Sequence, residues 1–326
     1  MDDIDRRLLS IAQLEFPVTS EPFAALGGQL GIDAAEVLER VQALKSSGTI
    51  RYIGPLFDAA ALGYQTTLVA MRIDDEQVEE ASRLLAAHQG ISHAYLREHR
   101  LNLWFTLAAP LRESREMEIQ RLATALSAGA VFDLPALRAF KLRAYFDATG
   151  SRMPAPDSGA PSRDVIMEGA PGLLPVDGVV INAVQQDLPL VPRPFDSMAD
   201  AVNMSTEAFV ACCQVMLRRG VMRRYGATLR HAALGIQANA LVCWSAPAGK
   251  AEEVGLRLSL LDEVSHCYLR RSYPLWPYNL YAMVHGETRE YLQSLIADVS
   301  GQLGLDDYLM LFTSRELKKT RVKYSV

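Results

Sequence analysis

The first 50 residues carry apolar side chains at the three- and four-residue spacing of amphipathic helices. The positions with this spacing are Ile4, Leu8, Ile11, Ala12, Val37, Val41 and Leu44. The second series stops just before Gly48, a residue type that commonly follows the end of a helix. The pattern therefore predicts a helical unit over residues 1–50.

Beyond this unit the pattern changes to short apolar runs typical of strands, separated by further helical segments. Strands are expected at residues 50–57, 66–73, 93–96 and 101–107, with a last one near 137–145. Helices are expected at residues 76–88 and 114–127. A helical head thus precedes a sheet with helices between its strands.

The chain also repeats its own sequence. Residues 48–68 align with residues 220–240, so that Gly54 falls on Gly226 and Gly63 on Gly235. H-A-Y-L-R at residues 93–97 likewise aligns with H-C-Y-L-R at 266–270. Residues 150–164 between the repeats are rich in Pro, Gly, Ser and Ala, which is typical of a linker. The sequence therefore predicts a tandem duplication.

Composition narrows the class of protein. The 326 residues are 49% hydrophobic, with no stretch long and apolar enough for a membrane span. We expect no secretory signal, because the acidic start M-D-D-I-D-R-R-L-L lacks the basic-then-apolar order of one. We expect a cytoplasmic protein. Cys212, Cys213, Cys243 and Cys267 form no C-x-x-C pair, and Cys212 and Cys213 are expected to pack in a helix. The net charge of −5 argues against extended contact with nucleic acid.

Several residues resemble the Lrp/AsnC family of transcription regulators. Both leucines of the Leu8-Leu9 pair, the L-x-x-x-G-x-I pattern from Leu44 to Ile50, and the later Leu62-Gly63 carry this resemblance. The family joins a DNA-binding helix-turn-helix to a ferredoxin-like ligand-sensing domain. The pattern occurs once in each half, and the two occurrences together cover nearly the whole chain.

A sharper resemblance is to the siroheme decarboxylases of the heme d1 and alternative heme pathways, at residues 93–106, 223–244 and 266–286. It implies an α+β fold in which each half has a winged helix-turn-helix-like head and a ferredoxin-like βαββαβ domain. The expected domains are a head at 1–50, an α/β domain at 51–149, a linker at 150–172, a second head at 173–220 and a second α/β domain at 221–326.

The resemblance implies that the chain is a carboxy-lyase. It would remove the acetate carboxyl groups on C12 and C18 of siroheme, giving 12,18-didecarboxysiroheme and carbon dioxide. No separate cofactor is expected, because iron enters as part of the substrate. The expected partners are siroheme and a second paired decarboxylase, with the two halves forming an internal pseudo-dimer that could assemble further into homo-oligomers. Nucleic acid and membranes are not expected partners.

A site for this reaction needs cations for the carboxylates, flat surfaces for the ring and a proton donor. His231 and His99 are the candidate catalytic residues. The candidate substrate-binding residues are Arg97, Arg223, Arg224, Arg230, Arg270, Arg271, Trp276, Tyr278 and Asn279. No metal-ligand set of the protein is predicted. Because Ala59 occupies the position of His231 in the first half, the two halves would not be catalytically equivalent, and we favour the second half.

Three further histidines receive supporting roles. His93 and His266 occupy equivalent positions, which favours a structural role common to both halves. His285 ends a strand-like run and is a candidate supporting residue behind the site.

Two other functions stay open. A DNA-binding regulator would use a basic recognition helix, but both heads carry more acidic than basic residues. A non-catalytic tetrapyrrole carrier or sensor would bind the same ligand without changing it. Nucleotide and zinc chemistry have no motif support, since G-x-G-x-x-G after a strand, the P-loop and H-E-x-x-H do not occur.

Overall fold

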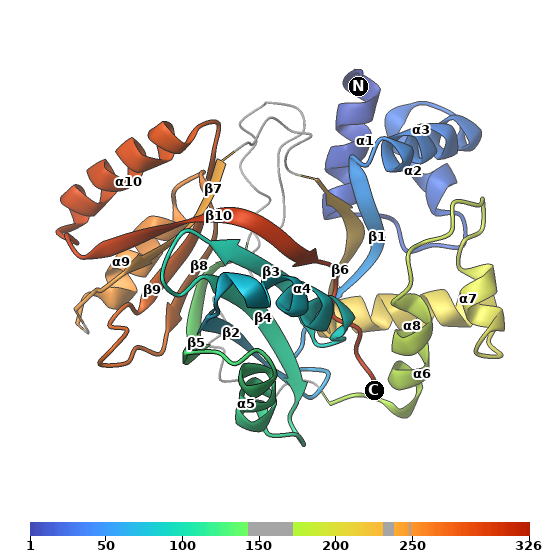
Figure 1. The fold of residues 1–326 in the computed structure, drawn as a ribbon. Coiled ribbons are helices and arrows are strands. Elements are labelled where there is room, and N and C mark those ends of the chain that lie inside the picture. Colours follow the sequence, from blue (N-terminus) through green and yellow to red (C-terminus); the bar gives the residue numbers. More distant parts are fainter. Residues whose placement is uncertain (143–171, 231–237, 248) are drawn as a thin grey trace.

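The chain folds into helical heads on one side and a β-barrel covered by helices on the other (Figure 1). The computed structural model describes residues 1–142, 172–230, 238–247 and 249–326. The first head contains α1 (Asp3–Leu14), α2 (Pro22–Leu30) and α3 (Ala34–Ser46). The second contains α6 (Pro175–Val184), α7 (Asp196–Asp200) and α8 (Thr206–Arg219).

Capping residues set the ends of the head helices. Asp2 and Asp5 form a reciprocal capping box at the start of α1, which satisfies backbone N–H groups that have no partner within the helix. The Ser205 hydroxyl accepts a hydrogen bond from the Ala208 N–H at the start of α8. Gly220 ends α8 with φ at 75°, a backbone conformation that favours glycine.

A two-stranded sheet joins the heads. Strand β1 (Ile50–Phe57) pairs antiparallel with β6 (Met222–Leu229), with Gly54 opposite Gly226. A Cβ on Gly226 would lie 2.8 Å from the carbonyl oxygens of Ala12 and Gln13, so glycine lets α1 pass directly over the sheet. Apolar residues of both heads and both strands form one continuous core.

The remaining strands close into a barrel in the order β10-β3-β4-β2-β5-β8-β9-β7. Its strands are β2 (Tyr64–Arg72), β3 (Ile91–Arg97), β4 (Leu103–Pro110), β5 (Ala130–Leu142), β7 (Ala238–Trp244), β8 (Val264–Arg270), β9 (Leu280–Gly286) and β10 (Tyr308–Lys319). The helices around it are η1 (Asp75–Gln77), α4 (Val78–Ala87), α5 (Arg115–Ala125), α9 (Ala251–Ser259) and α10 (Arg289–Leu303).

Strands β5 and β10 each belong to both halves of the barrel. The first part of β5 pairs with β2 and its second part with β8 of the other repeat. Strand β10 likewise pairs with β7 and then with β3. Each repeat therefore supplies the strand that closes the sheet of the other, which confirms the predicted α+β duplication.

Apolar residues fill three layers of this part of the molecule. Separate cores lie under α4 and α5 on the first sheet and under α9 and α10 on the second. A third cluster lies inside the barrel and includes Trp104, Leu134, Trp276, Tyr281 and Leu311. Inside the barrel, side chains of one sheet thus pack against those of the other.

Two strands differ from the sequence-based expectation. The last strand of the first half begins at Ala130 rather than near residue 137, because its first part follows α5 directly and pairs with β2. Strand β1 lies outside the barrel and pairs with β6, although it was expected as part of the first α/β domain. Among the described residues, no helix is long and apolar enough to cross a membrane.

Candidate functional site

The H-A-Y-L-R segment of β3 places polar side chains inside the barrel. Ala94 and Leu96 pack under the outer helices, which leaves His93 and Arg97 for the other face of the strand. The ring centroids of His93 and Tyr95 are 6.3 Å apart, and the Arg97 guanidinium lies 5.3 Å from the Tyr95 ring. The three side chains therefore form a row along the barrel interior.

The matching segment of β8 repeats this row from the other repeat. His266 and Tyr268 stack with ring centroids 6.3 Å apart, and the Arg270 guanidinium lies 4.5 Å from the Tyr268 ring. The barrel interior thus carries two His-x-Tyr-x-Arg rows, one from each repeat.

The arginines of these rows are held by backbone carbonyl groups. Arg97 is 5% exposed and donates from Nη1 to the Leu311 oxygen at 2.8 Å, and Arg270 donates to the Leu134 oxygen at 2.7 Å. Burial lowers the pKa of Arg97 to about 10 and also lowers the pKa of Arg270. Both groups are cations inside the protein that bind β5 and β10 within the strand, next to the point where each strand changes its pairing partner.

The histidines lie at the opposite end of the rows, near the heads. The His93 Nδ1 is 2.9 Å from the Ser92 hydroxyl, and the His266 Nδ1 is 2.9 Å from the Ser265 hydroxyl. Burial lowers the pKa of His93 and of His266 to about 4, and the Lys319 ammonium lowers both further. In the described part of the chain, no group of three His, Cys, Asp or Glu residues is arranged to hold a metal ion.

A pocket of about 240 Å³ opens at this end of the barrel, between β1, the first sheet and the C-terminal segment. Its lining includes His93, Ser92, Tyr52, Arg321 and Tyr324. The pocket is smaller than the 300 to 1,000 Å³ typical of ligand sites.

Basic side chains gather around this end. Burial lowers the pKa of Lys319, Glu316 raises it, and Arg51 and Arg230 lower it further. Burial also lowers the pKa of Arg321, and Arg224 lowers it further. Arg51 pairs with Glu316, with 3.4 Å between Nη1 and Oε1. We name Arg51, Arg224, Arg230, Lys319 and Arg321 the cationic cluster. The Arg321 guanidinium also donates to the Pro55 carbonyl on β1 and to the Thr228 hydroxyl on β6 at 2.8 Å. The cluster therefore lies between the barrel and the sheet that joins the heads, where an anion would be attracted.

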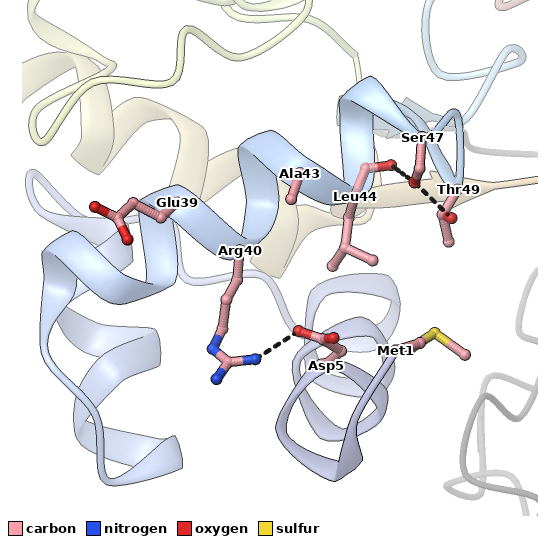
Figure 2. A pocket seen from close by; sticks show the side chains of 8 residues that line it. All are labelled: Met1, Asp5, Glu39, Arg40, Ala43, Leu44, Ser47 and Thr49. Carbon is pink, nitrogen blue, oxygen red and sulfur yellow. Dashed lines mark hydrogen bonds and ion pairs between the residues drawn. The ribbon is translucent and has the colours of Figure 1, made fainter.

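A larger hollow of about 540 Å³ lies on the first head, between α1 and α3 (Figure 2). Arg40 is the cation in it, and its guanidinium is bound by the carboxylates of Asp2, Asp5 and Glu36. Glu39 adds a further negative charge to its lining. This hollow therefore does not suit a ligand with many carboxylates.

Comparison with known proteins identifies the family. Residues 61–141 and 233–318 match the AsnC-like ligand binding domain, and residues 5–51 and 177–223 match the siroheme decarboxylase NirDL-like HTH domain. A siroheme decarboxylase of Hydrogenobacter thermophilus is 34% identical over 98% of this chain and 94% of its own length. The chain belongs to the siroheme decarboxylase family.

Solved structures and shorter relatives agree with this assignment. A crystal structure of the siroheme decarboxylase NirDL in co-complex with an iron-uroporphyrin III analogue has a TM-score of 0.75 and 31% identity, and covers all of this chain and 95% of its own. A siroheme decarboxylase alpha subunit of Desulfovibrio desulfuricans is 40% identical over 45% of this chain and 84% of its own length. This family member therefore has about two subunit lengths in one chain.

The arginines predicted around His231 occupy different environments. Arg223 forms an ion pair with Asp58, with 2.6 Å between Nη2 and Oδ2, which ties β6 to the segment after β1. Arg224 is half-buried, and burial lowers its pKa. Arg230 is exposed and has its guanidinium next to Gly48. Arg224 and Arg230 belong to the cationic cluster, whereas His231 lies outside the described residues and its role stays a prediction.

The other predicted site residues lie at the far end of the barrel, beyond Arg97 and Arg270. Trp276 is 1% exposed, donates to the Tyr281 hydroxyl at 2.7 Å and packs against Trp104. His99 contacts the Trp276 ring edge-on and accepts at Nδ1 from the Leu101 N–H, and burial lowers its pKa. These residues close that end of the barrel.

Three more predicted residues lie beside this closed end. Tyr278 donates to the Asp307 carboxylate at 3.2 Å, and Arg271 is exposed, with its N–H bonded to the Pro135 oxygen. The Asn279 amide accepts from the Ala246 N–H and donates to the Ala246 oxygen. Asn102 makes the same pair of bonds to Ile73 in the first half. Asn102 and Asn279 are thus equivalent clamps, by which we mean that each side chain binds both backbone groups of one residue elsewhere in its repeat.

Sequence reasoning missed much of the cluster near the heads. Lys319, Arg321 and Arg51 were not predicted as site residues, and the sequence favours a structural role for His93 and His266. The period-two spacing of His, Tyr and Arg in both motifs shows that they share one strand face. That this face lines a barrel interior depends on strand pairing between the repeats.

Proposed function

We propose that this chain is a siroheme decarboxylase and a carboxy-lyase that removes the acetate carboxyl groups on C12 and C18. The observation that carries the proposal is the 34% identity to the Hydrogenobacter thermophilus siroheme decarboxylase over nearly the full length of both chains. A related structure holds an iron-uroporphyrin III analogue, which is also an iron tetrapyrrole with carboxylate side chains.

The geometry near the heads supports this chemistry. The cationic cluster would attract the carboxylates of the substrate, and Arg321 is held rigidly by β1 and β6. The histidine ends of the two rows supply imidazoles beside it. Cations and neutral imidazoles therefore lie together at one end of the barrel.

Each reaction step breaks the bond between a carboxyl carbon and the adjacent methylene carbon. The bonding electrons stay on the methylene carbon and carbon dioxide leaves. A proton then forms a C–H bond at that carbon, which completes a methyl group. Electrons balance without an oxidant or reductant, so the proposal includes no separate cofactor, and the iron belongs to the substrate.

His231 is the proposed proton donor, whereas His93 and His266 beside the cationic cluster are neutral at pH 7, because burial lowers their pKa to about 4. A donor with a pKa near the working pH can both give its proton and take up a new one from water. We propose that the productive site lies in the second half, because Ala59 at the equivalent position of the first half carries no exchangeable proton.

We further propose that the two repeats act as an internal pair. The shared strands β5 and β10 support this, and the Desulfovibrio desulfuricans relative is a separate subunit about as long as one repeat. Size-exclusion chromatography with light scattering tests whether the chain also assembles with further copies or with a second paired decarboxylase.

An absorption titration with siroheme, combined with a DNA retention assay at moderate salt, separates the candidate functions. The proposal predicts a saturable shift of the siroheme absorption spectrum, a decarboxylated product and no sequence-specific DNA retention. A spectral shift with unchanged ligand mass would indicate a carrier or sensor. DNA retention without a shift would indicate a regulator, and either result would contradict the proposal.

A further inference from the structure

The surroundings of His93 in the first repeat and of His266 in the second differ by one side chain. His93 lies opposite Thr106 in the β3–β4 pair, and His266 lies opposite Met283 in the β8–β9 pair. Two residues further along each second strand are Ala108 in the first repeat and His285 in the second. The second repeat therefore has an additional imidazole at a position where the first has a methyl group.

This histidine completes a hydrogen-bonded chain. The Ser265 hydroxyl lies 2.9 Å from the His266 Nδ1 and 2.7 Å from the His285 Nε2. It also lies 3.3 Å from the Met283 carbonyl oxygen. His285 is 9% exposed, and Ser265 is 4% exposed, so the chain is largely shielded from water.

The single proton of the Ser265 hydroxyl can serve only one of these neighbours at a time. If His285 donates its Nε2–H to Ser265, the hydroxyl oxygen is satisfied as an acceptor and its own proton can go to the His266 Nδ1. His266 then carries its proton on Nε2. Without His285, the hydroxyl can turn to the Met283 oxygen and leave the His266 tautomer unfixed.

We propose that His285 is a positioning residue that acts through Ser265 to hold His266 with its proton on Nε2, the ring nitrogen left to face the substrate. The inference rests on the proposed function for its catalytic consequence. It gives a physical reason for a difference between the repeats, since Ser92 and His93 have the first two members of the chain and Ala108 replaces the third.

The surrounding charges favour neutral rings, which the tautomer argument requires. Burial lowers the pKa of His285 to about 4, and His266 and Lys319 lower it further. Arg270 on the same strand and Lys319 on β10 act on His266 in the same direction, and His266 in turn lowers the pKa of His93 on β3. At pH 7 these imidazoles are therefore neutral and hold one ring proton each.

The test combines 15N-histidine NMR with steady-state kinetics on the full chain. We expect the His266 Nε2–H tautomer in the wild type and a change toward Nδ1–H in His285→Ala. His285→Gln places an amide N–H near the position of the imidazole Nε2 and should restore the wild-type tautomer. The kcat should fall at least about tenfold in His285→Ala, with KM within about threefold, and recover in His285→Gln.

His88→Ala is the matched control, because its Nε2 lies 2.7 Å from Glu118 in the helix layer outside the barrel. It should leave both the His266 tautomer and kcat unchanged. An unchanged His266 tautomer in folded His285→Ala would overturn the proposal. Equal loss of kcat in His285→Gln and His285→Ala would overturn it too, because the imidazole itself would then be required. If wild-type chain does not decarboxylate siroheme, the proposed function fails, while the tautomer shift still decides the positioning role.

Discussion

The buried histidines of the barrel couple its stability to pH. The pKa values of His93, His266 and His285 are lowered to about 4 in the folded chain, mainly by burial, from an ordinary value of 6.5. Between pH 6.5 and pH 4 the unfolded chain therefore binds more protons than the folded chain. The contribution of these histidines to the free energy of unfolding should be complete above pH 6.5 and should be lost as the pH falls through this window.

Urea unfolding at pH 7 and pH 5 measures this dependence. His285→Gln removes one titrating imidazole and should lose less stability than the wild type between the two pH values. Equal losses in both proteins would show that His285 does not titrate in this window.

Substitutions at His231 and His99 distinguish a catalytic role from a packing role. His231→Ala should leave siroheme binding intact and slow turnover about a hundredfold, a barrier change of about 2.7 kcal/mol, which is the usual contribution of a positioned general acid. His99→Ala should retain turnover, because His99 packs on Trp276 at the far end of the barrel. Product mass reports turnover and the absorption shift reports binding. Loss of turnover in His99→Ala alone would place the chemistry in the first half.

The sequence predicted which types of residue form the site better than it predicted where these residues lie. The arginine and histidine motifs predicted a site for an anionic ring, and Arg224 and Arg230 lie in the cationic cluster. Trp276 matched the expected aromatic surface in composition but is buried at the other barrel end. A sequence pattern shows which residues share a strand face, but not at which end of a closed barrel a pocket lies.

At the scale of elements, matched asparagines hold the strand ends of both repeats. Asn102 bonds both backbone groups of Ile73, and Asn279 bonds both backbone groups of Ala246. Replacing either with Ala leaves a backbone N–H and oxygen without these partners. Each variant should lose about 1 to 3 kcal/mol of unfolding free energy in urea titrations.

The same pair tests the predicted substrate role of Asn279. If Asn279 is only a clamp, siroheme affinity should be equal in Asn102→Ala and Asn279→Ala. Weaker binding in Asn279→Ala alone would restore it as a substrate-binding residue.

Strands β5 and β10 show why element boundaries were harder to predict than element types. The expected helices at 76–88 and 114–127 correspond to η1 with α4 and to α5. Strand β5 instead begins well before the expected 137, since its two parts face different neighbours and its pattern changes along its length. Pairing between repeats overrides the local signal at such strands.

At the scale of the whole molecule, the shared barrel makes the repeats interdependent. Each isolated repeat would expose the edges that β5 and β10 cover, together with the apolar side chains of the barrel interior. Two fragments produced by a cut between residues 150 and 164 should therefore copurify when coexpressed, as shown by affinity capture of one tagged fragment. Soluble, folded fragments with no affinity for each other would contradict the shared barrel.

The duplication and the family resemblance were readable from sequence, because the H-x-Y-L-R and Gly-containing motifs recur in both halves. The two-stranded sheet of β1 and β6 was not, because its strands come from different repeats and lie apart from the barrel. This sheet supplies Arg51 and Arg224 to the cationic cluster.

The mass of the tetrapyrrole after anaerobic incubation of siroheme with the purified chain tests the central claim most directly. The account predicts successive loss of one and then two carboxyl groups as carbon dioxide over the time course, with no added cofactor. A tetrapyrrole that is bound by the protein but keeps its full mass throughout would contradict it.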